Sequence, residues 1–297
     1  MKKLNLNGII PACITTFSQE GKIDIISMKN HIKYLIKNGI KSVLILGSTG
    51  EFAYINFDEK VKLIQEIGKF LSSSYPDVQY IVGVSSTNLK ESIELGEIAY
   101  KSSANAVIAI LETYFPLEKD QIISYYVELS NNLKIPLIAY NFPLVSGVDL
   151  LPKILVELAE TGAIIGVKET AVPINIIKEL LEEAPEDFTT IIGTDMMLKG
   201  SIEIGIRSAI LGSGNYIPRN LVQYFSAVEQ NDINEQLKIW KIISKKISIL
   251  TYGLNLLPSI IKEAVILSGS PIPPYVRRPL PMVSEKLRNK IKRVLLK

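Results

Sequence analysis

Short runs of apolar residues recur along this chain and are separated by segments of helical length. Eight of the runs are almost continuously apolar and do not alternate apolar with polar positions. This pattern is typical of parallel strands that are covered by helices on both faces. The predicted strands are 8–17, 42–48, 80–86, 106–111, 136–141, 164–170, 189–195 and 208–214.

The segments between the runs carry apolar residues at helical spacing. Segments 58–71 and 119–131 both show this spacing, and Asp58 is a candidate N-cap for the first of them. Eight strands that alternate with helices predict a (β/α)8 TIM barrel, an α/β fold. A doubly wound open sheet is the alternative, but no GxGxxG follows a strand and no Walker A loop is present.

The pattern changes after the eighth run. Segments 231–247 and 255–268 are helical in spacing and have no strand between them. We therefore predict a barrel over 1–225 and a C-terminal helical extension over 226–297 that packs on the barrel or on a neighbouring subunit. The proline-rich stretch 269–281 contains tyrosine and valine, so we expect an ordered loop there and no flexible linker.

Composition and charge narrow the classes of function. The 33 Lys+Arg and 30 Asp+Glu residues give a net charge of +3, too balanced to indicate nucleic acid or an anionic membrane as the main partner. No apolar run reaches the length of a membrane span, and the N-terminal residues lack the apolar stretch of a signal peptide. We therefore expect a cytoplasmic protein.

Cysteine and histidine are each represented once, by Cys13 and His31. One cysteine cannot form an internal disulfide. This count argues against a zinc cage, a Cys-His nucleophile pair and a Ser-His-Asp triad.

Polar residues follow several of the predicted strands, where a barrel places its chemistry. Ser48 and Thr49 end the second strand, Tyr140 ends the fifth, and Lys168 lies near the end of the sixth in "GVKET". An apolar barrel interior disfavours the ammonium form of a lysine and so favours the nucleophilic amine. Such an amine forms an imine with a ketone, and a nearby phenol can transfer the protons.

Each of these residues also has a purely structural interpretation. A lysine at the end of a strand is commonly a solvated rim residue, and a tyrosine there can simply hold a backbone carbonyl. Glu51 is expected to be an N-terminal helix charge, and Asp195 the cap of the helix that follows it. The convergence of Lys168, Tyr140 and the "GSTGE" turn at one end of the barrel favours catalysis.

The motifs "GSTGE" (47–51), "IAYNFP" (138–143), "GVKET" (166–170) and "VRRPLP" (276–281) resemble the dihydrodipicolinate synthase/N-acetylneuraminate lyase family of pyruvate-dependent class I aldolases. The resemblance covers nearly the whole chain. It implies a TIM barrel with added C-terminal helices, a homotetramer, and catalysis without a metal or an organic cofactor, through a covalent imine between the lysine and pyruvate or another 2-oxo acid.

The resemblance also implies roles for individual residues. Lys168 matches the Schiff-base lysine, and Tyr140 matches the acid/base tyrosine. Ser48 and Thr49 are expected to bind the carboxylate of the substrate. Thr170, Gly193 and Ile210 are expected to make further contacts with the substrate.

Departures from the family motifs bear on the substrate. Val145 stands where dihydrodipicolinate synthases have a carboxylate-binding arginine. Asp195 is followed by Met196, so half of the Asp-Glu pair of sialic acid lyases is missing. In "ETYFPLEK", Phe115 replaces the second tyrosine of the family's pair, which is usually contributed across a subunit interface. Because phenylalanine cannot transfer a proton, Tyr140 would work alone or with Tyr114 or a water molecule as proton relay.

The sequence therefore predicts a carbon–carbon lyase that reversibly cleaves a 2-keto-3-deoxy sugar acid, of the 2-keto-3-deoxygluconate type, to pyruvate and an aldehyde. An N-acetylneuraminate lyase-like enzyme and a dihydrodipicolinate synthase-like enzyme are the alternatives with the same chemistry. A barrel that binds 2-oxo acids without catalysis is the alternative from another class. The predicted partners are the small-molecule substrates and further copies of the chain, with no nucleic acid and no membrane.

Overall fold

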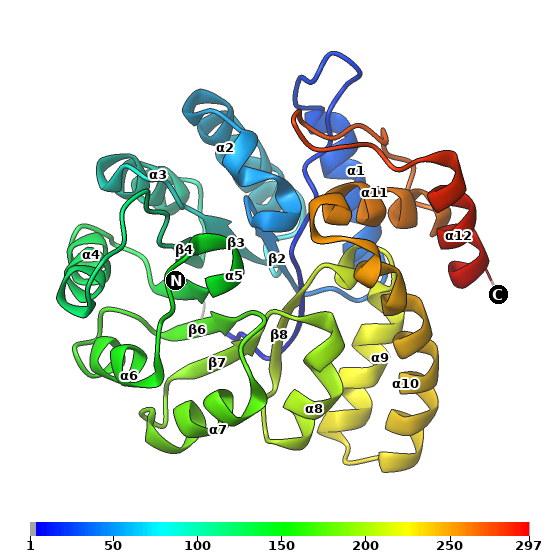
Figure 1. Cartoon of the computed structure of the whole chain (residues 1–297). Coiled ribbons are helices and arrows are strands. Elements are labelled where there is room, and N and C mark those ends of the chain that lie inside the picture. The colour runs from blue at the N-terminus through cyan, green and yellow to red at the C-terminus, as the bar shows by residue number, and fades with distance from the viewer. Residues whose placement is uncertain (1–3, 297) are drawn as a thin grey trace.

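Eight parallel strands form one sheet that closes into a barrel, in the computed structural model of residues 4–296 (Figure 1). The strands are β1 (Gly8–Pro11), β2 (Ser42–Ile45), β3 (Gln79–Gly83), β4 (Ala106–Ile110), β5 (Leu137–Asn141), β6 (Gly166–Glu169), β7 (Thr189–Ile192) and β8 (Ser208–Leu211). They pair in the order β1-β8-β7-β6-β5-β4-β3-β2, and a parallel bridge between Ala12 and Leu44 joins the two ends. The predicted TIM barrel is confirmed, because a doubly wound sheet would stay open.

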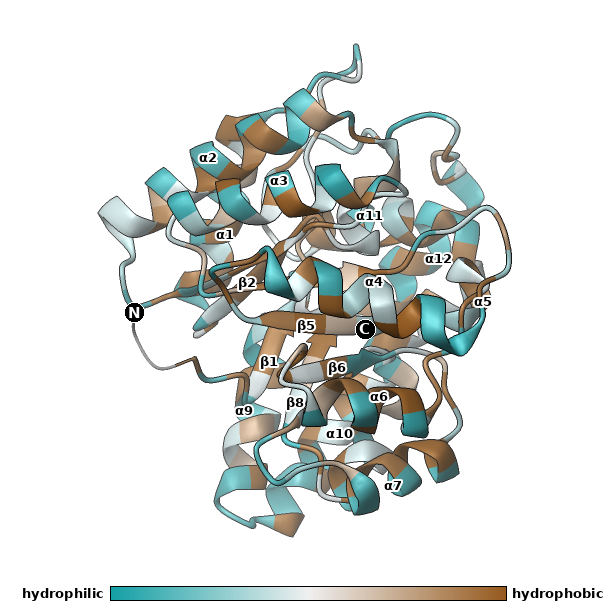
Figure 2. Cartoon of the chain, turned by 90° about the vertical axis from the view of Figure 1, so that its left-hand side faces the viewer, coloured by the Kyte–Doolittle hydropathy of each residue, from teal (hydrophilic) through white to brown (hydrophobic). Residues whose placement is uncertain are grey.

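Helices surround the strands in chain order (Figure 1). Those of the barrel are α1 (Ile25–Lys37), α2 (Phe57–Ser74), α3 (Leu89–Lys101), α4 (Lys119–Asn131), α5 (Pro143–Ser146), α6 (Pro152–Glu160), α7 (Ile174–Glu183), α8 (Leu198–Glu203) and α9 (Pro218–Glu229). Figure 2 shows a mostly hydrophobic β5 at the centre, while helices such as α2 and α3 carry hydrophobic and hydrophilic residues in alternation. This is the arrangement in which each helix buries one apolar stripe against the sheet.

Three further helices follow the barrel helices, and they are α10 (Ile233–Ile247), α11 (Leu257–Leu267) and α12 (Glu285–Leu295). Helix α10 packs on α9, and α11 lies against the short 3-10 helix η1 (Ser48–Gly50) that follows β2. The predicted boundary between the barrel (1–225) and the extension (226–297) falls inside helix α9. Residues 1–3 and 297, at the ends of those two regions, lie outside the described residues.

All eight predicted strands exist, but most of them end earlier than the apolar pattern suggests. The first strand ends at Pro11 and only isolated bridges follow it, although Ile14 and Phe17 farther along are fully buried. Chain segments beyond the ends of the strands remain covered by other parts of the protein, so burial continues after pairing stops. Apolar pattern therefore marks burial and overestimates strand length.

One local prediction about helices is wrong. Helix α2 is capped by Asn56, which forms a capping box with Glu59, and Asp58 lies in the first turn. Asn56 accepts from the Glu59 backbone N–H at 2.9 Å, so this side chain satisfies a donor that Asp58 cannot reach.

Within residues 4–296 no single helix combines the length and the apolarity needed to cross a membrane. The segments Ile233–Tyr252 and Leu254–Leu267 meet the length and composition criteria only as a pair, and they are bent by 100° relative to each other.

Candidate active site

Lys168 and Tyr140 lie side by side on adjacent strands. Lys168 of β6 is the register partner of Tyr140 of β5, so both side chains point to the same side of the sheet. Both are nearly buried, with 4% and 6% of their surface exposed. The Lys168 Nζ lies 3.9 Å from the centroid of the Tyr140 ring. Among the ion pairs of the described residues, none includes Lys168.

A cavity of about 270 Å³ surrounds the lysine at the C-terminal end of the barrel. Its wall contains every residue predicted to be catalytic or to bind substrate: Ser48, Thr49, Tyr140, Lys168, Thr170, Gly193 and Ile210. These residues come from five different strands or the turns after them. The fold therefore gathers the predicted set around one space.

Gly193 follows β7 and leaves room for two of these side chains. A Cβ atom built at this position would lie 1.9 Å from Thr170 Oγ1 and 2.8 Å from Lys168 Cε. Any larger residue would have to displace the lysine or the threonine. The absence of a side chain at 193 is therefore a steric requirement of the site.

A hydroxyl pair connects the tyrosine to the turn after β2. The Ser48 Oγ and the Tyr140 hydroxyl are 3.2 Å apart, and either can donate. Ser48 and Thr49 begin η1, where the first backbone N–H groups have no acceptor within the helix. The turn thus offers hydroxyls and N–H groups to an anion beside the lysine.

Thr170 presents a hydroxyl without a partner. Its Oγ1 is buried and forms no hydrogen bond with any described residue. Buried hydroxyls almost always have a partner, and an unsatisfied one costs roughly 1–3 kcal/mol. A polar ligand group in the cavity would supply the missing bond.

A second cavity, of about 650 Å³, adjoins the first. The two share Ser48, Phe142, Leu254 and Leu257. The second is lined mainly by apolar side chains, together with Glu51, Glu112 and a few neutral polar groups. Sequence reasoning did not single out Glu112, whose pKa is raised by burial and lowered in part by Lys60.

The remaining substrate-related positions lie near these cavities or outside them. Val145 is 51% exposed and lines the larger cavity, and Met196 is 52% exposed and lines the smaller one. Tyr114 and Phe115 are 92% and 72% exposed and line neither cavity of the single chain. Their rings meet edge to face, with centroids 5.1 Å apart.

Asp195 does not cap a helix, contrary to expectation. It begins the 3-10 helix η3 (Asp195–Met197), which has no side-chain cap. Its Oδ1 instead accepts a hydrogen bond from the Ser213 backbone N–H at 3.1 Å, which joins the loop after β7 to the loop after β8. Burial raises the pKa of this carboxyl group.

Glu51 is not an N-terminal helix charge either, because its side chain is buried and paired. The residue has φ 61°, in the left-handed region, and directly follows η1. Its Oε1 accepts from Lys262 Nζ at 2.5 Å, and both side chains are fully buried. Its Oε2 accepts from the Arg277 backbone N–H at 2.7 Å.

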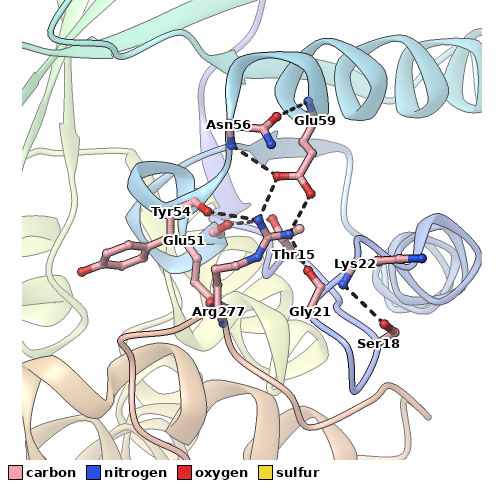
Figure 3. A network of polar contacts seen from close by, with 10 residues as sticks. Thr15, Ser18, Gly21, Lys22, Glu51, Tyr54, Asn56, Glu59 and Arg277 are labelled. Carbon is pink, nitrogen blue, oxygen red and sulfur yellow. Dashed lines mark hydrogen bonds and ion pairs between the residues drawn. The ribbon is translucent and has the colours of Figure 1, made fainter.

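Arg277 extends this network to the start of α2 (Figure 3). Its guanidinium donates to both Glu59 oxygens, at 2.8 and 2.9 Å, and to the carbonyls of Tyr54 and Gly21 at 3.2 and 2.6 Å. The C-terminal segment therefore holds the turn that carries Ser48. Sequence reasoning missed this network, although Lys262 within the apolar "PSIIKEAVIL" was a usable signal.

Glu169 lies next to the lysine in sequence but has a different environment. Its Oε2 accepts from Asn141 Nδ2 at 3.0 Å, and the side chain is 2% exposed. Burial raises the pKa of Glu169 to about 8, and nearby Asp149 adds to the shift. The carboxyl group therefore favours its protonated form up to mildly basic pH.

The two rare residues noted in the sequence are buried. Burial raises the pKa of the Cys13 thiol to about 12, which leaves it unreactive as a nucleophile. His31 contacts Ser270 and Asn215 through its two ring nitrogens at 3.1 and 3.0 Å. Within residues 4–296, no three His, Cys, Asp or Glu side chains are grouped so that they could hold a metal ion.

Comparison with known proteins finds relatives that this chain matches along nearly all of their length. The model of the dihydrodipicolinate synthetase family matches residues 5–297. The putative 2-dehydro-3-deoxy-D-gluconate aldolase YagE of Escherichia coli (strain K12) is 28% identical over 295 residues, covering 97% of this chain and 95% of YagE. The 4-hydroxy-tetrahydrodipicolinate synthase of Methanospirillum hungatei JF-1 is also 28% identical, over 97% of this chain and 98% of that protein.

The fold agrees with this relationship. The crystal structure of YagE in complex with pyruvate has a TM-score of 0.92 to this chain at 26% identity, and the match covers 98% of this chain and 97% of that one.

Proposed function

Because this chain belongs to the dihydrodipicolinate synthetase family of pyruvate-dependent class I lyases and aldolases, we propose that it reversibly cleaves a 2-keto-3-deoxy sugar acid to pyruvate and an aldehyde. The observation that carries the proposal is the buried Lys168, packed on Tyr140, in a cavity lined by Ser48, Thr49 and Thr170. The proposed substrate type is 2-keto-3-deoxygluconate.

The chemistry follows from the position of the amine. The Lys168 amine attacks the C2 ketone of the substrate, and the carbinolamine loses water to give a protonated imine. Tyr140 donates its phenol proton to the hydroxide that leaves the carbinolamine, and the resulting phenolate takes the proton of the C4 hydroxyl, with Ser48 at 3.2 Å as its relay. The C3–C4 bond breaks, its electron pair moves toward the iminium nitrogen, and the aldehyde leaves.

The remaining enamine completes the cycle. Protonation at C3 regenerates the iminium of pyruvate, and water releases pyruvate and the free lysine. We assign the substrate carboxylate to Ser48 and Thr49, and a substrate hydroxyl to Thr170, whose Oγ1 lacks a partner. The cycle as proposed requires no metal and no organic cofactor.

Two features weigh against the alternatives in this family. A dihydrodipicolinate synthase-like reaction would require a second carboxylate to bind, and Val145 offers no guanidinium for it. A sialic-acid-type reaction would use an acidic pair after β7, and here Asp195 is hydrogen-bonded to Ser213 while Met196 takes the second position.

The test is borohydride trapping with pyruvate, followed by intact and peptide mass spectrometry. We expect one reduced pyruvyl adduct on the peptide that contains Lys168. The Lys168→Met variant should lose the adduct, whereas Lys101→Met, at an exposed lysine of α3, should keep it. An adduct on another lysine, or none, would refute the proposal.

The aldehyde partner is then identified with pyruvate and a panel of acceptors. Glyceraldehyde should be used in preference to N-acetylmannosamine and aspartate semialdehyde. A preference for aspartate semialdehyde would overturn the role given to Val145.

A further inference from the structure

The two adjoining cavities contain one cationic side chain between them. That residue is Lys168, and no arginine or other lysine among residues 4–296 lines either cavity. The charged groups that accompany it in the walls are acidic: Asp195 in the smaller cavity, and Glu51 and Glu112 in the larger one.

Cations behind the walls already have partners. Lys262 is fully buried and donates to Glu51 and to the Tyr275 carbonyl at 2.7 Å. Arg277 makes a two-pronged ion pair with Glu59.

Lys60 is the third cation near the walls, and it is 8% exposed. Its Nζ donates to the Ser85 carbonyl at 3.1 Å. Recruiting any of these three cations for a ligand would break a buried hydrogen bond or ion pair.

An anionic group beyond the carboxylate held at Ser48 and Thr49 would therefore enter without a counter-charge. Phosphate and carboxylate groups are bound in proteins by charge-assisted, often bidentate hydrogen bonds. Without such partners the lost hydration is not compensated. Hydroxyl groups face no such cost, because the free Thr170 Oγ1 and the Glu112 carboxylate can both bond to them.

We propose that the aldehyde half of the substrate is uncharged and hydroxylated, so that the enzyme uses non-phosphorylated sugar acids and discriminates against phosphorylated or dicarboxylic ones. This inference rests on the proposed function and names the substrate class for the same site. The discrimination arises from the missing second cation in the cavity walls.

The first test compares three aldehydes in the synthetic direction with pyruvate: glyceraldehyde, glyceraldehyde 3-phosphate and succinate semialdehyde. We expect kcat/KM for glyceraldehyde to exceed the other two values by about tenfold or more. Equal or better use of either charged aldehyde would overturn the inference.

The second test adds the missing charge at an exposed wall position. Val145→Arg places a guanidinium in the larger cavity, and Met196→Arg places one in the smaller cavity, with Val145→Gln and Met196→Gln as uncharged controls of similar reach. One arginine variant should raise kcat/KM for glyceraldehyde 3-phosphate at least about fivefold over its glutamine control. The variant that does so identifies the cavity that holds the phosphate-bearing end of the substrate.

If both arginine variants trap pyruvate normally and neither improves use of the phosphorylated aldehyde, the inference is wrong. Pyruvate trapping on Lys168 separates this failure from that of the proposed function. Loss of trapping in the unmodified enzyme refutes the aldolase proposal itself. If Lys168 traps pyruvate but the enzyme prefers glyceraldehyde 3-phosphate, only the proposed substrate class is refuted.

Discussion

Thr170 carries a buried hydroxyl that forms no hydrogen bond with any described residue. We expect Thr170→Val, which keeps the shape of the side chain, to lower kcat/KM for the hydroxylated aldehyde about tenfold, since one hydrogen bond to substrate is lost. Thr170→Ser should retain most of the activity. Steady-state kinetics with glyceraldehyde and pyruvate measure the effect, and an unchanged kcat/KM in the valine variant would remove Thr170 from the substrate site.

Glu169 makes stability depend on pH. Because its pKa is raised from 4.5 to about 8, the folded protein holds this proton more tightly than the unfolded chain does. The free energy of unfolding should therefore be highest below pH 4.5 as far as this group is concerned, and fall as the pH rises to about 8. Glu169→Gln keeps an acceptor for Asn141 and cannot ionise.

We expect this variant to melt at a higher temperature than the unmodified protein at pH 8.5 and to lose the difference at pH 5, as measured by thermal denaturation. Glu160→Gln, at an exposed position of α6, serves as the control and should leave the pH profile unchanged. If Glu169→Gln is destabilised equally at pH 5 and pH 8.5, ionisation of Glu169 is not the cause of the pH dependence of stability.

At the scale of elements, helix α11 is tied to η1 by a fully buried ion pair. Lys262→Met leaves the Glu51 carboxylate buried beside only the Arg277 backbone donor, which should cost about 3–5 kcal/mol of unfolding free energy. Adding Glu51→Gln to the same chain removes the stranded charge and should restore part of that loss. Urea denaturation measures both variants.

Lys286→Met, on the exposed side of α12, should change stability little and serves as the control. Glu51→Gln is also measured alone. If the loss of unfolding free energy in the double variant equals the sum of the two single losses, the two residues act independently.

The elements differ in how far the sequence predicts them. Lys168 and Tyr140 could be placed together because strand order and register in a barrel follow from the repeating apolar runs. The pairing of Glu51 with Lys262 could not, since the two are 211 residues apart and meet only after the helical extension packs on the barrel. The cap at Asn56 was missed because Asp58, two residues on, is an equally good capping residue by type.

On the scale of the whole molecule, the exposed Tyr114–Phe115 pair points to association. Two large aromatic side chains that are 92% and 72% exposed on one loop are unusual for a surface that faces only water. We expect a homo-oligomer, a tetramer by family resemblance, with this loop at a subunit contact. Light scattering coupled to gel filtration should show a lower mass for Phe115→Ser at micromolar concentration.

Tyr100→Ser, at a 40% exposed tyrosine of α3, is the matched control and should leave the mass unchanged. A monomeric unmodified protein, or a Phe115→Ser variant of unchanged mass, would show that the loop is not part of a contact.

The network around Glu51 also sets an order of events during synthesis of the chain. All eight strands have been translated by Leu211, whereas Lys262 and Arg277 are added 51 and 66 residues after it. A nascent chain can thus hold its complete set of strands while the turn that carries Ser48 and Thr49 still lacks the donors that Lys262 and Arg277 supply to Glu51. Prematurely terminated products should consequently contain Lys168 without an organised pocket, and the proposed pyruvate chemistry should begin only when translation is nearly finished.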